Sequence, residues 1–583
     1  MCGLFGITHP NIPRARKALQ SLSHRGPDQS GDWHDAGLYI GHRRLSILDL
    51  SVNGKQPMLA SKTGVLSTVN GEIYNFRELR KELQEKHVFY SQSDSEVVLN
   101  GYLEWGLDKL LDRIDGMYAF SIYDPRVNKV HLARDIAGIK PLYYYFDGKQ
   151  FGWASELKAI VNYLGESQLT LDQSALYDFL TYLYIPPPKS MYQNIFKLEA
   201  AHTLSIDLNS KVMKKKRYWS LPTAVVDTDE VSAQKQLKLL VSQSIEEQLI
   251  SDVPLGFFLS GGIDSSVIVS CAAQQSQNIN TYTIGFDVPG YDESEFAQSV
   301  AAMHATRHCS KIMRRQRCID LYSRLNQWFD EPHADTSALP TFMVSELAKK
   351  DVSVVLTGDG GDEIFGGYIH YFKFKKITAS RYTNLSGLKS INAWLKQKFQ
   401  SKEIGKLFSN IERRYFLTDL ELHCRLLGGM LKNEKNKYRL KFGISDDYDD
   451  YWFFRQYYRE ELPIITRLQY LDFHTYLPED ILTKVDRTSM AVSLEARVPF
   501  ISKKIIEFSF SLPESIRIPN HEPKGILTQS FATQLPKQIL GRKKKGFTIP
   551  IKPWRTDFFG QYRFPQEQTL NELFLAGTSS NLG

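Results

Sequence analysis

The chain has 583 residues, of which 42% are hydrophobic and 23% charged, so it is long enough for more than one soluble domain. Its formal net charge of +7 is too small for this length to indicate a nucleic-acid-binding protein. No apolar run approaches the ~20 residues of a membrane span and no signal-peptide pattern is present, so we expect a cytoplasmic protein.

The first notable feature is a cysteine at position 2. It is one of five cysteines, an odd number without the spacing of metal ligands, which fits a reducing compartment. Removal of Met1 would give Cys2 a free α-amine with a reference pKa of about 8. A neutral amine can accept the thiol proton and activate the sulfur. Cys2 is therefore a candidate nucleophile, although a cysteine at this position is most often incidental.

Alternating apolar residues predict strands Gly37–Ile47, Gly64–Val69, Tyr118–Tyr123, Lys129–Arg134 and Gln150–Ala154. Asn70-Gly71 follows the second strand and is typical of a turn. The Asn70 amide and the Gly71 N–H are also the two donors that a tetrahedral oxyanion requires. A charged helix face over residues 76–87 is predicted to be solvated, and Ser93–Glu96 is typical of a helix start.

These motifs resemble the class-II, N-terminal-nucleophile glutamine amidotransferase domain, in which a cysteine attacks the glutamine amide and releases ammonia. The resemblance implies an Ntn-hydrolase α/β/β/α sandwich over residues 1–208, with Cys2 as nucleophile and Asn70 with Gly71 as the oxyanion hole. The implied glutamine-binding residues are Arg44, Ile47, Asn70, Glu72 and Asp94. A guanidinium suits the α-carboxylate of glutamine, and two carboxylates suit its α-ammonium. The stretches 134–143 and 154–156 also match the family, and we interpret them as structural and as a route for ammonia.

Residues 209–230 are polar and contain Pro222, which predicts an inter-domain linker. A helix is expected over about 231–250. The apolar run Leu255–Leu259 then precedes Ser260-Gly261-Gly262-Ile263-Asp264-Ser265-Ser266, and an amphipathic helix follows. Glycines allow close approach of a ligand, and a helix N-terminus attracts an anion, so we expect a polyphosphate here. Asp264 would repel a phosphate unless Mg²⁺ bridged the two.

Two further strands, Thr281–Asp287 and Val352–Leu356, are predicted to deliver loops to the same sheet edge. Gly285 would let a flat ring approach, so adenine and ribose are assigned to this neighbourhood. The predicted ATP-binding residues are Phe258, Leu259, Ser260, Gly261, Gly262, Asp264, Ser265, Ser266, Ile284, Thr357 and Gly358.

Three acids, Asp359, Asp362 and Glu363, lie within five residues after the third strand, and their repulsion calls for a cation. We assign Asp362, with Asp264, to Mg²⁺, and Asp359 to organising the adenylate or shuttling protons. Lys524 is expected to neutralise the α-phosphate as pyrophosphate leaves; the alternative is an ordinary surface lysine. The basic run 542–545 is either a solvated face or a phosphate contact.

The serine-lined loop resembles the pyrophosphate loop of N-type ATP pyrophosphatases, and the two halves together resemble the glutamine-hydrolysing asparagine synthetase family. The resemblance implies a parallel-sheet α/β synthetase domain with a helical extension over residues 231–583. In that family ATP adenylates the aspartate β-carboxylate, and ammonia travels through an internal tunnel to displace AMP. It also implies ATP as co-substrate with Mg²⁺, and glutamine and aspartate as small-molecule substrates. From the charge and the lack of long apolar runs we expect no nucleic-acid or membrane partner. The sequence leaves the oligomeric state open, with a homodimer as one option.

This sequence departs from the family pattern at residues expected near the carboxylate that accepts the ammonia. Asp359 stands in place of a glutamate, Ser502 in place of a frequent aspartate, and Thr528 in place of a frequent arginine. They motivate an alternative in which the same chemistry amidates another carboxylate, such as a uronic acid of a surface polysaccharide. A β-lactam-forming relative would lack the glutaminase nucleophile, and a silent scaffold would not need intact motifs at both sites. The stretch 378–435 is predicted to be helical and charge-rich, with no assigned chemistry.

Overall fold

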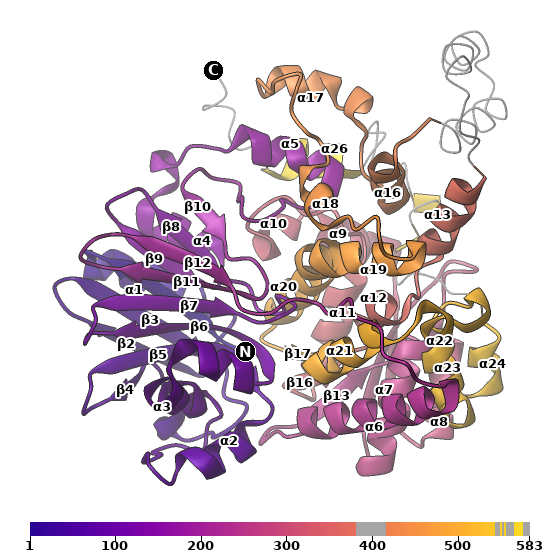
Figure 1. Cartoon of the computed structure of the whole chain (residues 1–583), viewed down its shortest axis with the longest axis horizontal. Coiled ribbons are helices and arrows are strands. Elements are labelled where there is room, and N and C mark those ends of the chain that lie inside the picture. Colours follow the sequence, from indigo (N-terminus) through magenta and orange to yellow (C-terminus); the bar gives the residue numbers. More distant parts are fainter. Residues whose placement is uncertain (381–415, 543–548, 551–552, 555–564, 575–583) are drawn as a thin grey trace.

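The computed structural model describes residues 1–380, 416–542, 549–550, 553–554 and 565–574. Figure 1 shows two parts side by side, an N-terminal part dominated by strands and a C-terminal part dominated by helices. The predicted basic residues 543–545 and most of the predicted helical stretch 378–435, namely 381–415, lie outside the described residues. Within the part of the chain that the structure describes, helices long and apolar enough to cross a membrane are absent.

Two six-stranded antiparallel sheets form the centre of the N-terminal part, with the orders β10-β8-β9-β1-β3-β2 and β12-β11-β7-β6-β5-β4. The strands of the first are β1 (Gly3–Thr8), β2 (Gln29–His34), β3 (Leu38–Arg44), β8 (Tyr143–Phe146), β9 (Phe151–Ala154) and β10 (Ile195–Lys197). Those of the second are β4 (Met58–Ala60), β5 (Val65–Ile73), β6 (Gly116–Asp124), β7 (Lys129–Arg134), β11 (His202–Asp207) and β12 (Met213–Arg217). All five predicted strands are present. The turn for which an Asn-Gly pair is typical does not form at Asn70-Gly71, because β5 continues through both residues and pairs with β6 as far as Ile73.

Side chains from the facing sheets meet in one apolar layer, which includes Leu4 and Trp153 from the first sheet and Leu66 and Leu132 from the second. This layer forms because alternate residues of a strand point to the same face. Helices cover the outer faces: α1 (Ile12–Gln20) and α4 (Leu157–Leu164) pack on the first sheet, and α2 (Phe76–Leu83) and α3 (Ser95–Arg113) on the second. The predicted four-layer sandwich is therefore confirmed.

The predicted helix over 76–87 is α2, and only one of its faces is solvated. Phe76, Leu79 and Leu83 are buried in an apolar cluster, at the three- and four-residue spacing of a helix. Its exposed face carries Glu82, which pairs with Arg113 at the end of α3. The expectation of a charged outer face therefore applies to one side of the helix.

The C-terminal part contains a five-stranded parallel sheet with the order β15-β14-β13-β16-β17. Its strands are β13 (Leu255–Phe258), β14 (Asn280–Phe286), β15 (Arg307–Met313), β16 (Val354–Leu356) and β17 (Glu495–Arg497). The helices that carry or cover the site are α6 (Glu230–Gln248), α7 (Ile263–Gln275), α8 (Ser294–Met303), α11 (Ala338–Ala348), α12 (Gly361–Phe365), α20 (Thr483–Met490), α21 (Lys503–Ser511) and α23 (Gly525–Phe531). The remaining described helices are α5 (Gln173–Tyr182), α9 (Arg315–Tyr322), α10 (Leu325–Trp328), α13 (Ile369–Ala379), α16 (Asp419–Leu427), α17 (Asn436–Lys441), α18 (Trp452–Tyr457), α19 (Ile464–His474), α22 (Glu514–Arg517), α24 (Lys537–Leu540) and α26 (Pro565–Gln568).

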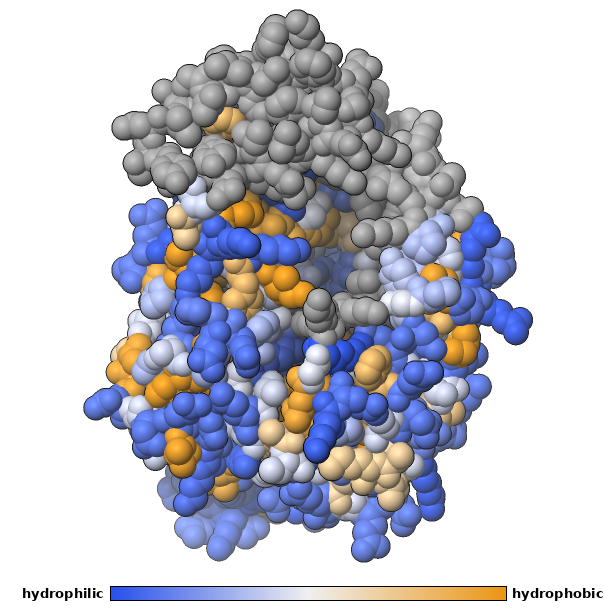
Figure 2. All heavy atoms as spheres, turned by 90° about the vertical axis from the view of Figure 1, so that its right-hand side faces the viewer, coloured by the Kyte–Doolittle hydropathy of each residue, from blue (hydrophilic) through white to orange (hydrophobic). Residues whose placement is uncertain are grey.

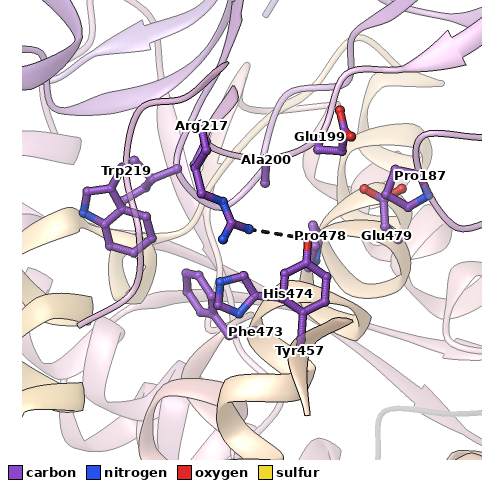
Figure 3. Close-up of a pocket in the computed structure, with 12 residues that line it drawn as sticks. Pro187, Glu199, Ala200, Arg217, Trp219, Tyr457, Phe473, His474, Pro478 and Glu479 are labelled. Carbon is purple, nitrogen blue, oxygen red and sulfur yellow. Dashed lines mark hydrogen bonds between the residues drawn. The ribbon is translucent and has the colours of Figure 1, made fainter. Parts of the chain in front are cut away.

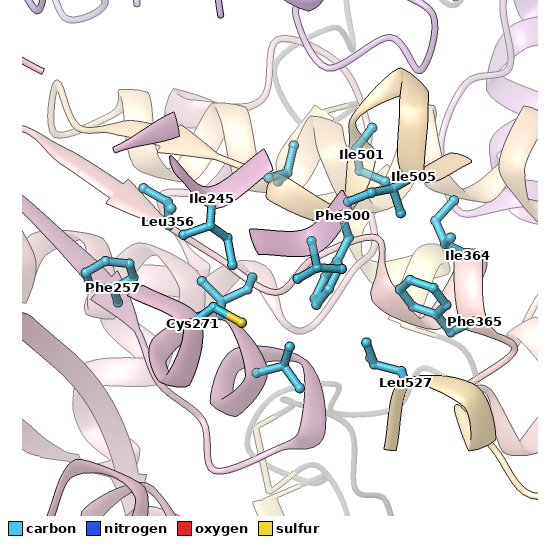
Figure 4. Packing of buried hydrophobic residues seen from close by; sticks show 14 of the residues in the cluster. Ile245, Phe257, Cys271, Leu356, Ile364, Phe365, Phe500, Ile501, Ile505 and Leu527 are labelled. Carbon is cyan, nitrogen blue, oxygen red and sulfur yellow. The ribbon is translucent and has the colours of Figure 1, made fainter. Parts of the chain in front are cut away.

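Both faces of this sheet are buried, as parallel sheets require. On one face Phe257 and Leu356 pack with Ile245 and Cys271 from α6 and α7 (Figure 4). On the other face Val355 packs with Phe342 of α11 and residues of α20. The core on the first face extends into the N-terminal part, since Met1, Ile47 and Tyr74 belong to the same apolar cluster. The two parts therefore share a hydrophobic core.

The stretch predicted as a linker, 209–230, contains β12, which pairs with β11 and completes the second sheet. Irregular chain follows from residue 218 to 229, and α6 begins at Glu230. On the face drawn in Figure 2, hydrophobic residues lie among hydrophilic ones. Exposed apolar side chains such as Val52 and Val231 are ordinary for a protein surface.

Candidate active sites

Cys2 lies just before β1 and is buried between the two parts of the chain. Its backbone N–H donates to Oδ1 of Asn70 at 2.9 Å, and Nε of Arg25 donates to its carbonyl at 2.9 Å. Asn70 is fully buried in β5, and its Nδ2 has no hydrogen-bond partner among the described residues. A buried amide donor without a partner is costly unless a ligand uses it. Its place beside Cys2 fits the oxyanion donor expected from the sequence.

Gly71 follows Asn70 within the strand, with φ +154°. A Cβ built on Gly71 would lie 2.0 Å from the carbonyl oxygen of Met117 in β6. Only glycine lets these two strands approach so closely at this point. Gly71, whose N–H we predicted to be an oxyanion donor, is therefore also required for the pairing of β5 with β6.

Burial raises the pKa of the Cys2 thiol, and the nearby N-terminal ammonium is the largest influence that lowers it. In the structure this ammonium belongs to Met1 and lies 2.8 Å from Oε2 of Glu495. Met1 and Glu495 are both almost completely buried. An amine close to the thiol is the arrangement that thiolate formation needs.

Arg44 ends β3, and its guanidinium is held by the loop that follows. Nη2 donates to the carbonyls of Leu48 and Asp49 at 2.8 and 2.7 Å, and Nη1 donates to the Gln29 side chain and the Ser51 carbonyl. Ile47 is buried in the same loop, and its carbonyl accepts from Asp252 N of the C-terminal part at 3.0 Å. These contacts anchor the segment that the sequence assigned to glutamine binding.

Glu72 and Asp94, the two carboxylates predicted for the glutamine ammonium, are both buried close together. Burial and the neighbouring Asp94 raise the pKa of Glu72, and burial raises the pKa of Asp94. Oδ2 of Asp94 accepts from Ile73 N at 2.8 Å, so this carboxylate does not cap α3 although the helix begins beside it. Two adjacent buried carboxylates suit a cationic ligand.

The serine-lined loop lies between β13 and α7 at the carboxyl edge of the parallel sheet. Oγ of Ser260 lies 3.1 Å from Oγ of Ser265 and accepts from Gly262 N at 3.3 Å. Gly261 has φ +69°, and a Cβ there would lie 2.6 Å from Phe296. The hydroxyl of Ser266 is buried without a partner among the described residues. The loop thus presents hydroxyls at the N-terminus of a 13-residue helix, as an anion site requires.

The residues flanking this loop have different surroundings. Leu259 is buried, with its N–H donating to the Tyr282 carbonyl at 2.9 Å, whereas Phe258 is half-buried. Ile284 belongs to β14 and is buried in the apolar core on one face of the sheet. A Cβ on Gly285 would lie 2.5 Å from Oδ1 of Asp292 and 2.8 Å from Cδ1 of Ile312, so the ends of these two side chains lie close to the glycine. The assignment of adenine and ribose to this neighbourhood stays a prediction.

The loop after β16 meets the serine-lined loop directly. A Cβ on Gly358 would lie 2.8 Å from Cβ of Asp264, and one on Gly361 would lie 2.6 Å from Oδ1 of Asp264. The ammonium of Lys524 contacts both Asp264 and Asp362, at 2.8 Å from Asp362. The structure therefore brings together the two carboxylates predicted for Mg²⁺ and the lysine predicted for the phosphate, and Lys524 is buried rather than a surface lysine.

Asp359 and Glu363 have separate environments. Oδ2 of Asp359 accepts from Thr357 Oγ1 at 2.5 Å, and Oδ1 accepts from Lys484 Nζ at 3.3 Å. Glu363 accepts from the Tyr368 hydroxyl at 2.7 Å, and burial raises its pKa to about 7. The three acids of this motif thus have different surroundings: Asp362 contacts Lys524, Asp359 contacts Lys484, and Glu363 is buried with its charge partly suppressed.

Sequence reasoning missed the charged residues that connect the two parts. Arg25 pairs with Asp486 of α20, and Arg497 of β17 lies 3.4 Å from Glu72. Lys484, two residues before Asp486, contacts Asp359. The sequence carries one hint of them, because a strand or helix with charges on a buried face needs partners elsewhere.

A small pocket also lies at the junction of the two parts (Figure 3). Arg217 and Trp219 come from the end of the N-terminal part, and Tyr457, Phe473 and His474 from the C-terminal helices. Its volume of about 20 Å³ holds little more than one water molecule. Among the described residues that we assign to either site, none lines this pocket.

Two family models cover almost the whole chain. The glutamine amidotransferase domain matches residues 1–219, and asparagine synthase matches residues 236–575. The chain belongs to the asparagine synthase family. It is 33% identical over 569 residues to asparagine synthetase [glutamine-hydrolyzing] 1 of Bacillus subtilis, covering 95% of this chain and 88% of that protein. Asparagine synthetase [glutamine-hydrolyzing] 3 of the same organism is 29% identical, with 94% and 87% covered.

Among solved structures, glutamine phosphoribosylpyrophosphate amidotransferase from B. subtilis, complexed with ADP and GMP, matches with a TM-score of 0.30 and 15% identity. The match covers 64% of this chain and 77% of that one.

Proposed function

We propose that this member of the family is a glutamine-hydrolysing asparagine synthetase. It would hydrolyse glutamine to glutamate and ammonia in the part around residues 1–208, and use ATP and aspartate to form asparagine, AMP and pyrophosphate in the part around residues 231–583. The observation that carries the proposal is the buried Nδ2 of Asn70 beside Cys2, which has no partner among the described residues, in a chain whose other half matches asparagine synthase.

In the glutaminase half, Cys2 Sγ attacks the amide carbon of glutamine after the α-amine exposed by removal of Met1 has taken the thiol proton. Asn70 Nδ2 and Gly71 N–H stabilise the oxyanion, and ammonia leaves as the thioester forms. Water then hydrolyses the thioester to glutamate. Arg44, Ile47, Glu72 and Asp94 hold the substrate, with the two carboxylates facing its ammonium.

In the synthetase half, a carboxylate oxygen of aspartate attacks the α-phosphorus of ATP, and pyrophosphate leaves. Ammonia then attacks the acyl carbon, and AMP leaves with the electron pair of the acyl–oxygen bond. The serine-lined loop, from Phe258 to Ser266, and the residues Ile284, Thr357 and Gly358 are assigned to ATP. Lys524 neutralises the phosphate charge that develops, and Asp359 organises the adenylate.

The carboxylates of Asp264 and Asp362 fit Mg²⁺, because hard oxygen donors converge there and Oδ1 of Asp264 is buried without a partner among the described residues. When bound, Mg²⁺ would neutralise the polyphosphate and favour departure of pyrophosphate. In the structure Lys524 occupies the position between the two carboxylates, so we propose that it moves toward the phosphate as the metal binds.

Aspartate is the acceptor that we propose, and one departure that had motivated a uronic acid has a structural role. Ser502 caps α21 by accepting from Ile505 N at 3.3 Å, a role that serine and aspartate share. Purified protein with glutamine and ATP, offered a panel of carboxylates, tests the acceptor by pyrophosphate release. Aspartate should be required; release with a uronic acid and not with aspartate would contradict the proposal.

A homodimer and a cytoplasmic location complete the proposal. All five cysteines are free, which fits a reducing compartment. Size-exclusion chromatography with light scattering at several protein concentrations measures the oligomeric state. A monomer at every concentration would exclude the dimer without affecting the catalytic proposal.

A further inference from the structure

Strand β17 is the edge strand of the parallel sheet and lies at the boundary between the two parts of the chain (Figure 1). Glu495 and Arg497 are two residues apart, so their side chains share one face of the strand, while Ala496 packs in a core on the other face. The carbonyl of Arg497 accepts from Thr357 N at 2.9 Å, in the loop that carries Asp359. One short strand therefore contacts the ATP-site loop through its backbone and the glutaminase site through its side chains.

Arg497 is fully buried, and three of its nitrogens face different partners. Nε donates to Oε1 of Glu495 at 2.7 Å, and Nη1 donates to the carbonyls of Gln248 and Ile250, both at 2.7 Å. Nη2 lies 3.4 Å from Oε2 of Glu72 and makes no hydrogen bond among the described residues. The guanidinium is thus anchored by the C-terminal part and directs its remaining donors at a carboxylate of the N-terminal part.

The charges around Glu72 are unbalanced without Arg497. The titratable and charged groups that face it are Asp94, Glu495, Arg497, Tyr74 and the N-terminal ammonium. In the structure three buried carboxylates therefore face two cations, and without Arg497 they would face only the N-terminal ammonium, which belongs to Met1 here and moves to Cys2 when Met1 is removed. Buried like charges raise one another's pKa and favour the neutral acid, whereas a buried guanidinium favours the anion. A protonated Glu72 would lose most of its attraction for an ammonium ligand.

We propose that Arg497, a residue of the synthetase half, is a positioning residue of the glutaminase site, where its charge favours the anionic form of Glu72 that faces the glutamine α-ammonium. The inference rests on the role of Glu72 under the proposed function. It adds that the glutamine site is incomplete without a strand of the other half. Arg497 acts through Glu72 and does not touch the scissile amide.

The test compares Arg497→Met, Arg497→Lys, Glu72→Gln and the double variant Glu72→Gln/Arg497→Met in the full-length protein. Glutaminase KM and kcat are measured between about pH 5.5 and 7.5, below the α-amino pKa of about 8. Ammonia-dependent AMP formation, which bypasses the glutaminase, checks that each variant is folded. Arg517→Met is the matched control, because Arg517 is another fully buried arginine whose partners, Ser509, Leu512 and Thr466, all belong to the C-terminal part.

For Arg497→Met we expect glutamine KM to rise about tenfold at neutral pH. The reason is that a rise of about one unit in the pKa of Glu72 lowers its ionised fraction by up to about tenfold. KM should fall again as the pH rises, because Glu72 ionises, and kcat should change less than about twofold. Arg497→Lys keeps the charge and should restore most of the affinity. Glu72→Gln should raise KM without this pH dependence, and the double variant should match Glu72→Gln.

A pH-independent rise in KM, or additive effects in the double variant, would overturn the inference. If Glu72→Gln raises KM and Arg497→Met does not, the inference fails while the proposed function stands. If Glu72→Gln leaves KM unchanged, the assigned role of Glu72 fails as well. Should Arg497→Met lose ammonia-dependent activity, Arg497→Lys decides: a KM within about threefold of the parent supports the inference, and a tenfold rise contradicts it.

Discussion

Arg25 and Asp486 form a bidentate ion pair across the junction of the two parts, with N···O distances of 2.7 and 3.0 Å. Nε of the same guanidinium donates to the carbonyl of Cys2. Asp486 shares α20 with Lys484, which contacts Asp359 at the ATP site. The backbone of the nucleophile is thus fixed by the helix that also holds a residue of the synthetase site.

We predict that Asp486→Asn destabilises the protein by about 3 kcal/mol, because it removes one of the two carboxylates that pair with the buried Arg25 and leaves only Glu156 to compensate the guanidinium. Burial opposes ionisation of Asp486, but Arg25 prevails and lowers its pKa. The stabilisation is therefore present above the unfolded pKa of about 3.9 and is lost as the pH falls below it. Chemical denaturation of parent and variant at neutral and acidic pH measures both effects.

The control for this experiment is Lys86→Gln, which breaks the exposed pair of Lys86 with Glu104. It should leave the denaturation midpoint unchanged, since exposed pairs contribute little. Equal losses in Asp486→Asn and Lys86→Gln would contradict the assignment of a special role to the buried pair.

Asn70→Asp is predicted to lower glutaminase kcat by about 10²–10³ with little change in KM, because it removes one oxyanion donor but keeps an acceptor for Cys2 N. Ammonia-dependent synthesis should be retained. Asn100→Asp is the matched control, since Asn100 is another buried asparagine of this part with an unpaired Nδ2 among the described residues. Similar kcat losses in both variants would rule out a specific role for Asn70.

Lys524→Gln is predicted to increase the thermal shift that Mg²⁺ alone produces, since Lys524 competes with the metal for Asp264 and Asp362. Pyrophosphate release should fall by about 10² or more, as a phosphate-neutralising charge is lost. Differential scanning fluorimetry with and without MgCl₂ measures the shift, and Asp264→Asn should abolish it. The same shift in parent and Lys524→Gln would show that the lysine does not share the metal site.

The raised pKa of Glu363 predicts that the free energy of unfolding depends on pH. Burial raises its folded pKa to about 7 from 4.5, so the folded state binds more protons between these values. Stability is therefore lost as the pH rises through this window, by up to about 3 kcal/mol, and stays constant above it. Glu363→Gln removes this contribution, so its thermal midpoint relative to the parent should increase from about pH 5 to 7. A difference that does not vary with pH would refute the assignment.

The strands followed from alternation and apolar runs, because local pattern decides which face of a strand is buried, whereas the order of the layers was implied by the family resemblance. The continuation of β5 through Asn70-Gly71 did not follow from the local pattern, since Asn-Gly is locally a turn dipeptide. Pairing with β6 overrides that preference, and Gly71 lets the backbones meet. Tertiary pairing thus decided a point that local propensity predicted wrongly.

In the synthetase site, the repulsion among the acids after β16 predicted Mg²⁺, which stays a prediction; in the structure the ammonium of Lys524, from more than 150 residues away, contacts Asp264 and Asp362. The partners of Cys2 and Glu72 could not be predicted. Arg25, Asp486 and Arg497 meet them only because the two halves share a core, and sequence spacing carries no information about such a contact.

The measurement that tests the central claim most directly is mass spectrometry of the products formed from amide-¹⁵N glutamine, ATP and aspartate. The account predicts asparagine with ¹⁵N in its side-chain amide, in amounts equal to the AMP released, and no such product from Cys2→Ala unless ammonia is added. AMP release with unlabelled product, or labelled ammonia with no amide product from any carboxylate, would contradict it.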